Sequence, residues 1–339
     1  MKSIICMEPY KLKMIEEEMP VRNENEALVK IRRIGICGTD LHAYRGNQPF
    51  FEYPRILGHE LSGEIMEIGN NKQNLKVGDK VSIIPYIECG KCMPCRLGKT
   101  NCCVNLSLFG VHKDGGMREY LCVPHDHLLC TNEISLDQAA IIECLAIGAH
   151  AVKRAEVKKN DNVLVVGAGP IGLGVMKYAK LKGANVIAVD MNENRLEFCK
   201  RWGPVDYTLN VNQDLPAEIS RITSGEMASI VFDVTGNARS MENAMNFAAH
   251  GGKLVFVGLV KDNISFYDPD FHKKEMTLLS SRNAQPDDFQ YVFQSIRDGH
   301  VDTASFITHR TDFDNTITEY ETWLKPDGGI IKAVVEINS

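Results

Sequence analysis

The sequence predicts an α/β protein in which a doubly wound parallel sheet is combined with a second, β-rich domain. Three observations support this fold class. A glycine-rich loop follows an apolar run near the middle of the chain, short apolar runs alternate with amphipathic segments after it, and apolar and polar residues alternate near the N-terminus. Strands that alternate with helices are typical of a parallel sheet, whereas apolar–polar alternation is typical of half-buried antiparallel strands. The chain of 339 residues is long enough for both domains to have a core.

The first part of the chain is expected to form the β-rich domain. Residues 27–32 alternate apolar and polar side chains, and strand-like segments recur at 63–69, 77–81 and 116–123. Glycines separate these segments, as expected for turns between antiparallel strands.

The pattern changes after Asp137. A helix is expected over residues 138–155, and short apolar strands are expected over 163–166, 186–190, 230–234, 254–258 and 276–279, with helices between them. The tail after about Ala284 holds one helical stretch and a final strand over 330–337. Because a lone strand leaves its backbone groups unpaired, this last strand is expected to join the β-rich domain. There are no internal repeats or low-complexity tracts.

The glycine-rich loop lies in residues 164–172, which read LVVGAGPIG. In a G-x-G-x-x-G turn the first glycine allows a tight turn, the second lets a pyrophosphate approach the backbone, and the third lets the following helix pack on the strand. This motif alone is weak. Here a strand is expected before it and a helix after it, and the next expected strand ends in the carboxylate of Asp190. The context therefore predicts a dinucleotide site.

The composition excludes several classes of partner. The formal net charge is −6, which argues against a nucleic acid or an anionic membrane as partner, because both are bound by basic surfaces. The longest apolar runs are far shorter than the ~20 residues of a membrane span. The N-terminus meets a charge too early for a secretory signal, so a cytoplasmic location is expected.

The cysteine pattern predicts a structural zinc site. Cys89, Cys92 and Cys95 are spaced C-x2-C-x2-C, and Cys103 follows after a short lobe. Four thiolates satisfy tetrahedral zinc and leave no open position, whereas Cys102, adjacent to the last ligand, is interpreted as a spare. The alternatives are a group of buried free thiols, or a nucleic-acid zinc module, which would normally occupy a basic segment.

A second, catalytic metal site is suggested by Cys37, His59, Glu60 and Glu143. Together they offer a soft ligand, an imidazole and two carboxylates from separated segments. A catalytic zinc needs about three protein ligands and one exchangeable position. Taken singly each residue has a structural interpretation, because a lone cysteine is usually in a core and a lone glutamate is usually on the surface.

The chain resembles the zinc-dependent medium-chain dehydrogenases over essentially its whole length. The segments GICGTD at 35–40, GHExxG at 58–63, the four-cysteine lobe and the glycine loop at 167–172 occur in the family's order. Glu143 falls where polyol dehydrogenases of this family carry Glu and ethanol-type enzymes carry Cys, although Cys144 replaces the proline that usually follows. The resemblance implies a GroES-like catalytic domain of residues 1–147 and 286–339, and an NAD-binding Rossmann domain of residues 148–285.

The resemblance also implies the reaction, in which hydride moves from a secondary alcohol to NAD. Zinc on Cys37 and His59, with Glu60 or Glu143 completing the shell, would bind the substrate hydroxyl. Thr39 would accept the alcohol proton and His42 would pass it to solvent, although His42 could instead be an ordinary surface histidine. The resemblance implies cofactor contacts from Gly167, Gly169, Pro170, Ile171, Gly172, Asp190, Arg195, Val257, Gly258, Leu259 and Ser281.

Within the family, residues 46–51, 110–116, 271–275 and 281–284 are similar to bacterial enzymes that oxidise the sugar acids L-galactonate and L-gulonate at C5. A sugar acid carries a carboxylate, which should be received by a cation. Arg282 is the first candidate, because polyol relatives place a substrate-contacting arginine there. The next candidates are Arg118 and Lys113, and the weaker ones are Arg45 and Arg55.

Two alternatives remain open on the sequence alone. The substrate could be a neutral polyol of the sorbitol or L-iditol type, or another secondary alcohol. The chain could also be a non-catalytic metal- or nucleotide-binding regulator, because a fold does not prove a function. The resemblance favours a homodimer or a homotetramer.

Overall fold

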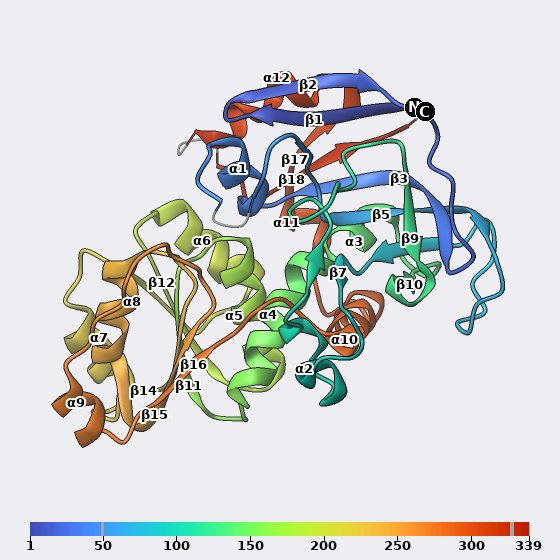
Figure 1. Ribbon diagram of the computed structural model, residues 1–339. Helices are drawn as coiled ribbons and strands as arrows, with labels where there is room; N and C mark the ends of the chain where they lie inside the picture. Colours follow the sequence, from blue (N-terminus) through green and yellow to red (C-terminus); the bar gives the residue numbers. More distant parts are fainter. Residues whose placement is uncertain (49–50, 326–328, 339) are drawn as a thin grey trace. The chain divides into compact units, whose positions relative to one another are not determined.

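The computed structural model describes residues 1–48, 51–325 and 329–338 (Figure 1). Pro49 and Phe50, which belong to the loop segment 46–51, lie outside the described residues. The chain divides into two compact units: unit 1 comprises Met1–Cys144 and Ala284–Ser339, and unit 2 comprises Leu145–Asn283. In the described part of the chain, every helix is too short or too polar to cross a membrane.

Unit 1 is built on a seven-stranded sheet in the order β10-β6-β5-β3-β18-β17, with β9 also paired to β3. Its strands are β3 (Glu26–Ile36), β5 (Glu60–Ile68), β6 (Lys80–Ile83), β9 (Tyr120–Pro124), β10 (Leu128–Cys130), β17 (Ile307–Asp312) and β18 (Lys332–Glu336). Apolar residues of alternating positions, such as Val29, Ile31 and Ile65, are completely buried and form the core. The C-terminal strand β18 joins this sheet as predicted, antiparallel to β3 (Figure 1).

Smaller elements complete unit 1. A three-stranded sheet contains β1 (Lys2–Glu8), β2 (Lys11–Glu16) and β4 (Arg55–Ile56), and a two-stranded sheet contains β7 (Tyr86–Ile87) and β8 (Ser107–Leu108). The helices are α1 (Gly38–Tyr44), α2 (Met93–Arg96), α3 (Leu136–Ala140), α10 (Pro286–Arg297), α11 (Thr303–Phe306) and α12 (Thr316–Tyr320). Helix α4 (Ile142–Ala155) begins at the end of the first segment of unit 1 and continues into unit 2.

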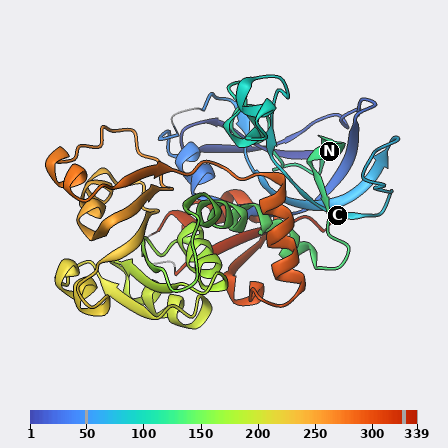
Figure 2. The same ribbon diagram turned by 90° about the horizontal axis from the view of Figure 1, so that it is seen from below.

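Unit 2 is a six-stranded parallel sheet in the order β13-β12-β11-β14-β15-β16, which confirms the doubly wound fold. Its strands are β11 (Asn162–Val166), β12 (Asn185–Asp190), β13 (Tyr207–Asn210), β14 (Ala228–Asp233), β15 (Ala248–Phe256) and β16 (Thr277–Ser280). Helices lie on both faces of the sheet (Figure 2): α5 (Pro170–Leu181), α6 (Glu193–Trp202), α7 (Leu215–Ile222), α8 (Ala238–Ala244) and α9 (Asp268–Lys273). The strand order reverses at β11, and ligands of open α/β sheets bind beyond the strand ends at such a point.

Several predicted boundaries are wrong, for identifiable reasons. The strand expected over 116–123 begins only at Tyr120, because the backbone of Gly115 and Gly116 is used to pack closely on Gly58 and Leu61. The strand expected over 77–81 begins at Lys80, since the residues before it form a turn. The strand expected over 254–258 ends at Phe256, and the helix expected over 138–155 is broken at its fourth residue, between α3 and α4.

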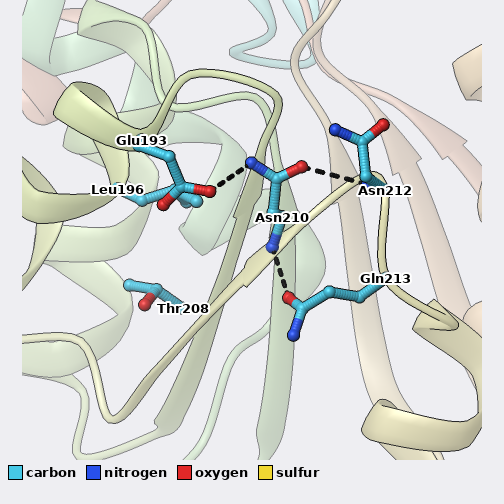
Figure 3. A pocket seen from close by; sticks show the side chains of 6 residues that line it. All are labelled: Glu193, Leu196, Thr208, Asn210, Asn212 and Gln213. Atoms are coloured by element: carbon cyan, nitrogen blue, oxygen red, sulfur yellow. Dashed lines mark hydrogen bonds between the residues drawn. The ribbon is translucent and has the colours of Figure 1, made fainter.

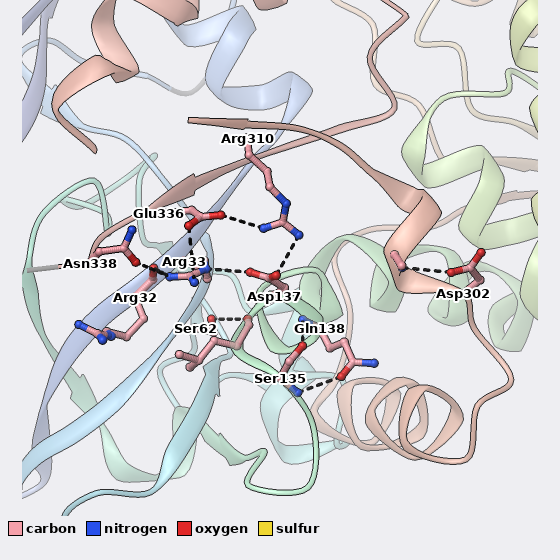
Figure 4. A network of polar contacts seen from close by, with 12 residues as sticks. Arg32, Arg33, Ser62, Ser135, Asp137, Gln138, Asp302, Arg310, Glu336 and Asn338 are labelled. Atoms are coloured by element: carbon pink, nitrogen blue, oxygen red, sulfur yellow. Dashed lines mark hydrogen bonds and ion pairs between the residues drawn. The ribbon is translucent and has the colours of Figure 1, made fainter. Parts of the chain in front are cut away.

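Strand β17 was not predicted, because its sequence ITHRTD has no apolar run. Polar contacts join β17 to its surroundings instead (Figure 4). Asp137 accepts hydrogen bonds from Arg33 Nε at 2.7 Å and from Arg310 at 2.9 Å, and Arg310 also pairs with Glu336 at 2.9 Å. Partial burial alone would raise the pKa of Asp137, but the two arginines outweigh it and hold the pKa below its ordinary value. This network connects β3, β17 and β18 at the start of α3.

Candidate functional site

Strand pairing brings three of the predicted metal ligands together in unit 1. Strands β3 and β5 are antiparallel, and Gly35 lies opposite Glu60. Cys37, just beyond the end of β3, and His59, just before β5, therefore lie at the same end of the sheet. The ligand atoms of Cys37, His59 and Glu60 are all within 4.8 Å of one another. His59 and Glu60 are buried, whereas Cys37 is half-buried.

Asp40 orients this group, and its role was not predicted from the sequence. Cys37 is the N-cap of α1, where its Sγ accepts a hydrogen bond from Thr39 N, and its own N–H donates to Asp40 Oδ2 at 3.0 Å. Asp40 Oδ1 accepts from Gly58 N at 3.2 Å and lies 3.4 Å from His59 Nδ1. Burial would raise the pKa of Asp40, but His59 and the backbone donors outweigh it and lower the pKa. A carboxylate beside the second ring nitrogen fixes the orientation of a metal-binding histidine.

Lys332 is a second site residue that was not predicted. Its Nζ lies 2.7 and 2.8 Å from the two carboxylate oxygens of Glu60 and 3.2 Å from the carbonyl oxygen of Ile36. Lys332 is 1% exposed, so its ammonium group is removed from water and its three donors meet three acceptors. The signal in the sequence was a cation among the apolar residues of the segment IIKAVVEI. Residue 333 pairs with Ile36, which places Lys332 beside the site.

Glu143 faces the same site but is not part of the group within 4.8 Å. It lies in the first turn of α4, is 4% exposed, and its Oε1 accepts a hydrogen bond from the hydroxyl of Tyr86. Burial raises the pKa of Glu143 to about 7; His59 and Tyr86 act to lower it, and Glu60 to raise it. Tyr86 is a third site residue that was not predicted. The two predicted proton carriers lie on α1, where Thr39 is half-buried and His42 is exposed.

The four cysteines of the predicted structural site also come together. Cys89, Cys92, Cys95 and Cys103 have their sulfur atoms within 4.8 Å of one another. The backbone N–H groups of Lys91 and Cys92 lower the pKa of Cys89 to about 6, which favours the thiolate that zinc requires. Cys102 is exposed and lies outside the group, in agreement with its interpretation as a spare. This donor set fits zinc without an open position.

Changing Cys95 to Ser is expected to remove one zinc per chain and to destabilise unit 1. A closed zinc site contributes folding free energy directly, because the metal does not find the same ligand set in the unfolded chain. Elemental analysis together with the melting temperature tests this. The matched control is Cys102→Ser, which removes a neighbouring exposed thiol and should keep the full zinc content. Unchanged zinc in Cys95→Ser would rule out the assignment.

The glycine loop of unit 2 has the backbone that a dinucleotide requires. Gly167 has a φ of +104°, and a Cβ on Gly172 would lie 1.9 Å from the carbonyl oxygen of Gly167, so both positions need glycine. Gly169 is the N-cap of α5, which begins with Pro170 and Ile171. Asp190 ends β12, and its carboxylate accepts from Ala168 N at 2.7 Å and from Asn192 N at 2.8 Å.

The other predicted cofactor residues lie at the same edge of unit 2. Arg195 is half-buried on α6, while Val257, Gly258 and Leu259 follow β15 and Ser281 follows β16. The Ser281 hydroxyl oxygen is buried and has no hydrogen-bond partner in the described structure.

A polar pocket lies beside this edge, at the end of β13 (Figure 3). It is lined by Glu193, Leu196, Thr208, Asn210, Asn212 and Gln213. Two of its side-chain amides are used within the pocket: the side chain of Asn210 donates to Glu193, and the side-chain oxygen of Gln213 accepts from the backbone N–H of Asn210 at 2.7 Å.

The three predicted substrate cations differ in their surroundings. Arg118 lies 3.5 Å from Asp114, and the Nζ of Lys113 lies 4.5 Å from the centre of the Phe109 ring. Both belong to unit 1. Arg282 is exposed and follows β16 in unit 2.

Comparison with known proteins defines the class to which this fold and these sites belong. Residues 23–133 match the alcohol dehydrogenase GroES-like domain, and residues 170–298 match the zinc-binding dehydrogenase domain. The chain therefore belongs to the zinc-binding alcohol dehydrogenase family, whose members are oxidoreductases that act on CH–OH groups.

Individual relatives align over nearly the whole chain. The L-galactonate-5-dehydrogenase of Escherichia coli is 44% identical over 99% of this chain and 98% of its own length. The sorbitol dehydrogenase of Bacillus subtilis is 30% identical over 100% of this chain and 98% of its own. The crystal structure of an alcohol dehydrogenase from E. coli in complex with NADH has a TM-score of 0.92 and 31% identity, and covers 99% of each chain.

Proposed function

We propose that this protein is a zinc- and NAD-dependent dehydrogenase that oxidises the C5 hydroxyl of L-galactonate or L-gulonate to the keto acid. The observation that carries the chemistry is the convergence of Cys37, His59 and Glu60 at one end of the β3–β5 ladder. The substrate class rests on the 44% identity to the L-galactonate-5-dehydrogenase, against 30% to the sorbitol dehydrogenase. The proposal includes a cytoplasmic location and a homodimeric or homotetrameric assembly.

Unit 1 is proposed to be the catalytic domain and unit 2 the NAD-binding domain. Cys37 and His59, with Glu60 or Glu143, would hold the catalytic zinc, and the donor set of one thiolate, one imidazole and one carboxylate suits that metal. When bound, zinc would act as a Lewis acid that lowers the pKa of the substrate hydroxyl toward neutral pH.

The remaining steps belong to the chain itself. Thr39 accepts the proton of the substrate hydroxyl as it gives up its own hydroxyl proton, and His42, three residues further along α1 and exposed, passes the released proton to solvent. Asp40 holds the His59 ring in place throughout. Arg282 is proposed to receive the substrate carboxylate, with Arg118 and Lys113 as further candidates.

The wild-type enzyme is expected to prefer NAD to NADP. The carboxylate of Asp190 suits the ribose hydroxyls and repels a 2′-phosphate, and this repulsion corresponds to about tenfold or more in kcat/KM. Asp190→Ala should lower the ratio of kcat/KM with NAD to kcat/KM with NADP. Glu193→Gln is the matched control, because it neutralises a nearby carboxylate that already bonds to Asn210. A wild-type enzyme that favours NADP would show that Arg195 attracts phosphate more strongly than Asp190 repels it.

The substrate assignment is tested by steady-state kinetics of the wild-type enzyme with NAD. Initial rates of NADH formation are compared for L-galactonate, L-gulonate, sorbitol and 2,3-butanediol. We expect one of the sugar acids to have the largest kcat/KM, because only the sugar acids have a carboxylate for the proposed partner Arg282 to bind. A larger kcat/KM for sorbitol would reject the sugar acid and leave a neutral-polyol dehydrogenase with the same zinc and NAD sites.

A further inference from the structure

The two carboxylates of the candidate catalytic site are held by partners of different kinds. Both oxygens of Glu60 meet the ammonium group of Lys332, so this carboxylate is already paired with a full positive charge. Glu143 instead accepts one hydrogen bond from the neutral hydroxyl of Tyr86 at Oε1. A neutral donor stabilises a buried carboxylate less than a paired cation does, so Glu143 is the more easily displaced of the two.

We propose that Tyr86 is a positioning residue whose hydroxyl holds the Glu143 carboxylate away from Cys37 and His59, and so keeps one coordination position free for substrate. This inference rests on the proposed zinc-dependent function. It is consistent with the arrangement of the side chains, because Cys37, His59 and Glu60 lie together while Glu143 is outside their group.

The tyrosine is fixed in the position that this role requires. Tyr86 is 4% exposed and lies on β7, which pairs with β8. Its carbonyl oxygen lies 3.1 Å from Nε2 of His127, and its ring packs edge-on against Phe289 with the ring centres 6.1 Å apart. Backbone and ring are therefore both held, and the hydroxyl cannot follow Glu143 if that side chain turns toward the metal.

Loss of the Tyr86 hydroxyl leaves the Glu143 carboxylate without its hydrogen-bond donor. A buried carboxylate without a donor is costly, so it will take the best remaining partner. Glu60 stays in its place beside Cys37 and His59, because its ion pair with Lys332 is unchanged. In Tyr86→Phe the zinc ion is therefore the partner that Glu143 gains, and a fourth protein ligand both tightens the metal and blocks the substrate position. A purely structural role of Tyr86 gives the opposite sign, because a loosened site releases zinc faster.

The test follows zinc release into excess EDTA from wild-type enzyme and from Tyr86→Phe. The release phase that is missing in Cys37→Ser identifies the catalytic zinc. We expect Tyr86→Phe to slow this phase about tenfold or more, the equivalent of one hydrogen bond to a charged group. The same variant should have a higher KM for the sugar acid. In Tyr86→Phe/Glu143→Ala the slowing should disappear, because the carboxylate that causes it is absent.

Tyr53→Phe is the matched control, since it removes a hydroxyl that bonds to backbone groups, donating to the carbonyl oxygen of Ala43. It should release zinc at the wild-type rate. Suppose that the wild-type enzyme is active and holds two zinc ions, and that Tyr86→Phe releases the catalytic zinc as fast as the wild type or faster. This result would overturn the role of Tyr86 and leave the proposed function standing. A wild-type protein that holds only the four-cysteine zinc would overturn both.

Discussion

Replacing Cys37 by Ser is expected to lower kcat/KM about a thousandfold or more and to leave the fold intact. The soft ligand at the end of β3 is lost, and with it the Lewis acid contribution of about 4 kcal/mol or more to the barrier. Serine is itself a good N-cap, so α1 should keep its first turn, in which Cys37 Sγ now accepts from Thr39 N. Kinetics with L-galactonate and NAD, zinc analysis and the melting temperature together check this result.

Cys102→Ser is the control for Cys37→Ser, because it removes an exposed thiol outside both candidate metal sites. It should keep wild-type zinc content and activity. A Cys37→Ser enzyme that has lost one zinc and still turns over at the wild-type rate would separate catalysis from the metal and contradict the proposed mechanism.

Replacing Lys332 by Met should strongly destabilise unit 1. The carboxylate of Glu60 is completely buried, and removing its cation leaves an unpaired charge away from water. Breaking one partner of a buried pair costs about 3–5 kcal/mol. Burial lowers the pKa of Lys332, but Cys144 and Glu60 outweigh this and raise it, so the side chain is charged in the folded protein. Urea unfolding followed by circular dichroism measures the loss.

Two further variants make the Lys332 experiment decisive. Lys332→Met/Glu60→Leu removes both charges and should recover most of the stability, because no buried charge is left unpaired and only the neutral carbonyl oxygen of Ile36 loses a donor. Lys200→Met removes an exposed ion pair with Glu197 and should change the free energy of unfolding by less than about 1 kcal/mol. If Lys332→Met behaves like Lys200→Met, the buried pair does not stabilise unit 1.

The parts of the site that were predicted from the sequence are those written in short local spacings. The four-cysteine lobe, the glycine loop, and the Cys37 and His59 motifs each occupy one short stretch of the chain, and Asp190 ends the next apolar run after the glycine loop. The doubly wound sheet was predictable for a related reason, because its buried strands are continuous apolar runs. The local structure of such patterns can be predicted without knowledge of any long-range contact.

The residues that were missed reach the site through long-range pairing. Lys332 lies there because β18 joins β3, which it follows in the chain by some 300 residues. Tyr86 depends on the two-residue strand β7, which has no sequence signature of its own. Asp40 is different, because it lies three residues beyond Cys37 as part of a capping box and could have been identified from that spacing. Strand β17 was missed because its sequence has no apolar run; its backbone pairs with β18, and its side chain Arg310 bonds to Asp137 and Glu336.

The most direct test of a zinc-dependent sugar-acid dehydrogenase is the rate of NADH formation from L-galactonate before chelation, after removal of the catalytic zinc, and after zinc is returned. The predicted result is that the wild-type protein is active and loses its activity as the catalytic zinc, the ion that Cys37→Ser lacks, is removed. The activity should return when one equivalent of zinc is restored. An unchanged rate of NADH formation after that zinc has gone would contradict the proposed mechanism.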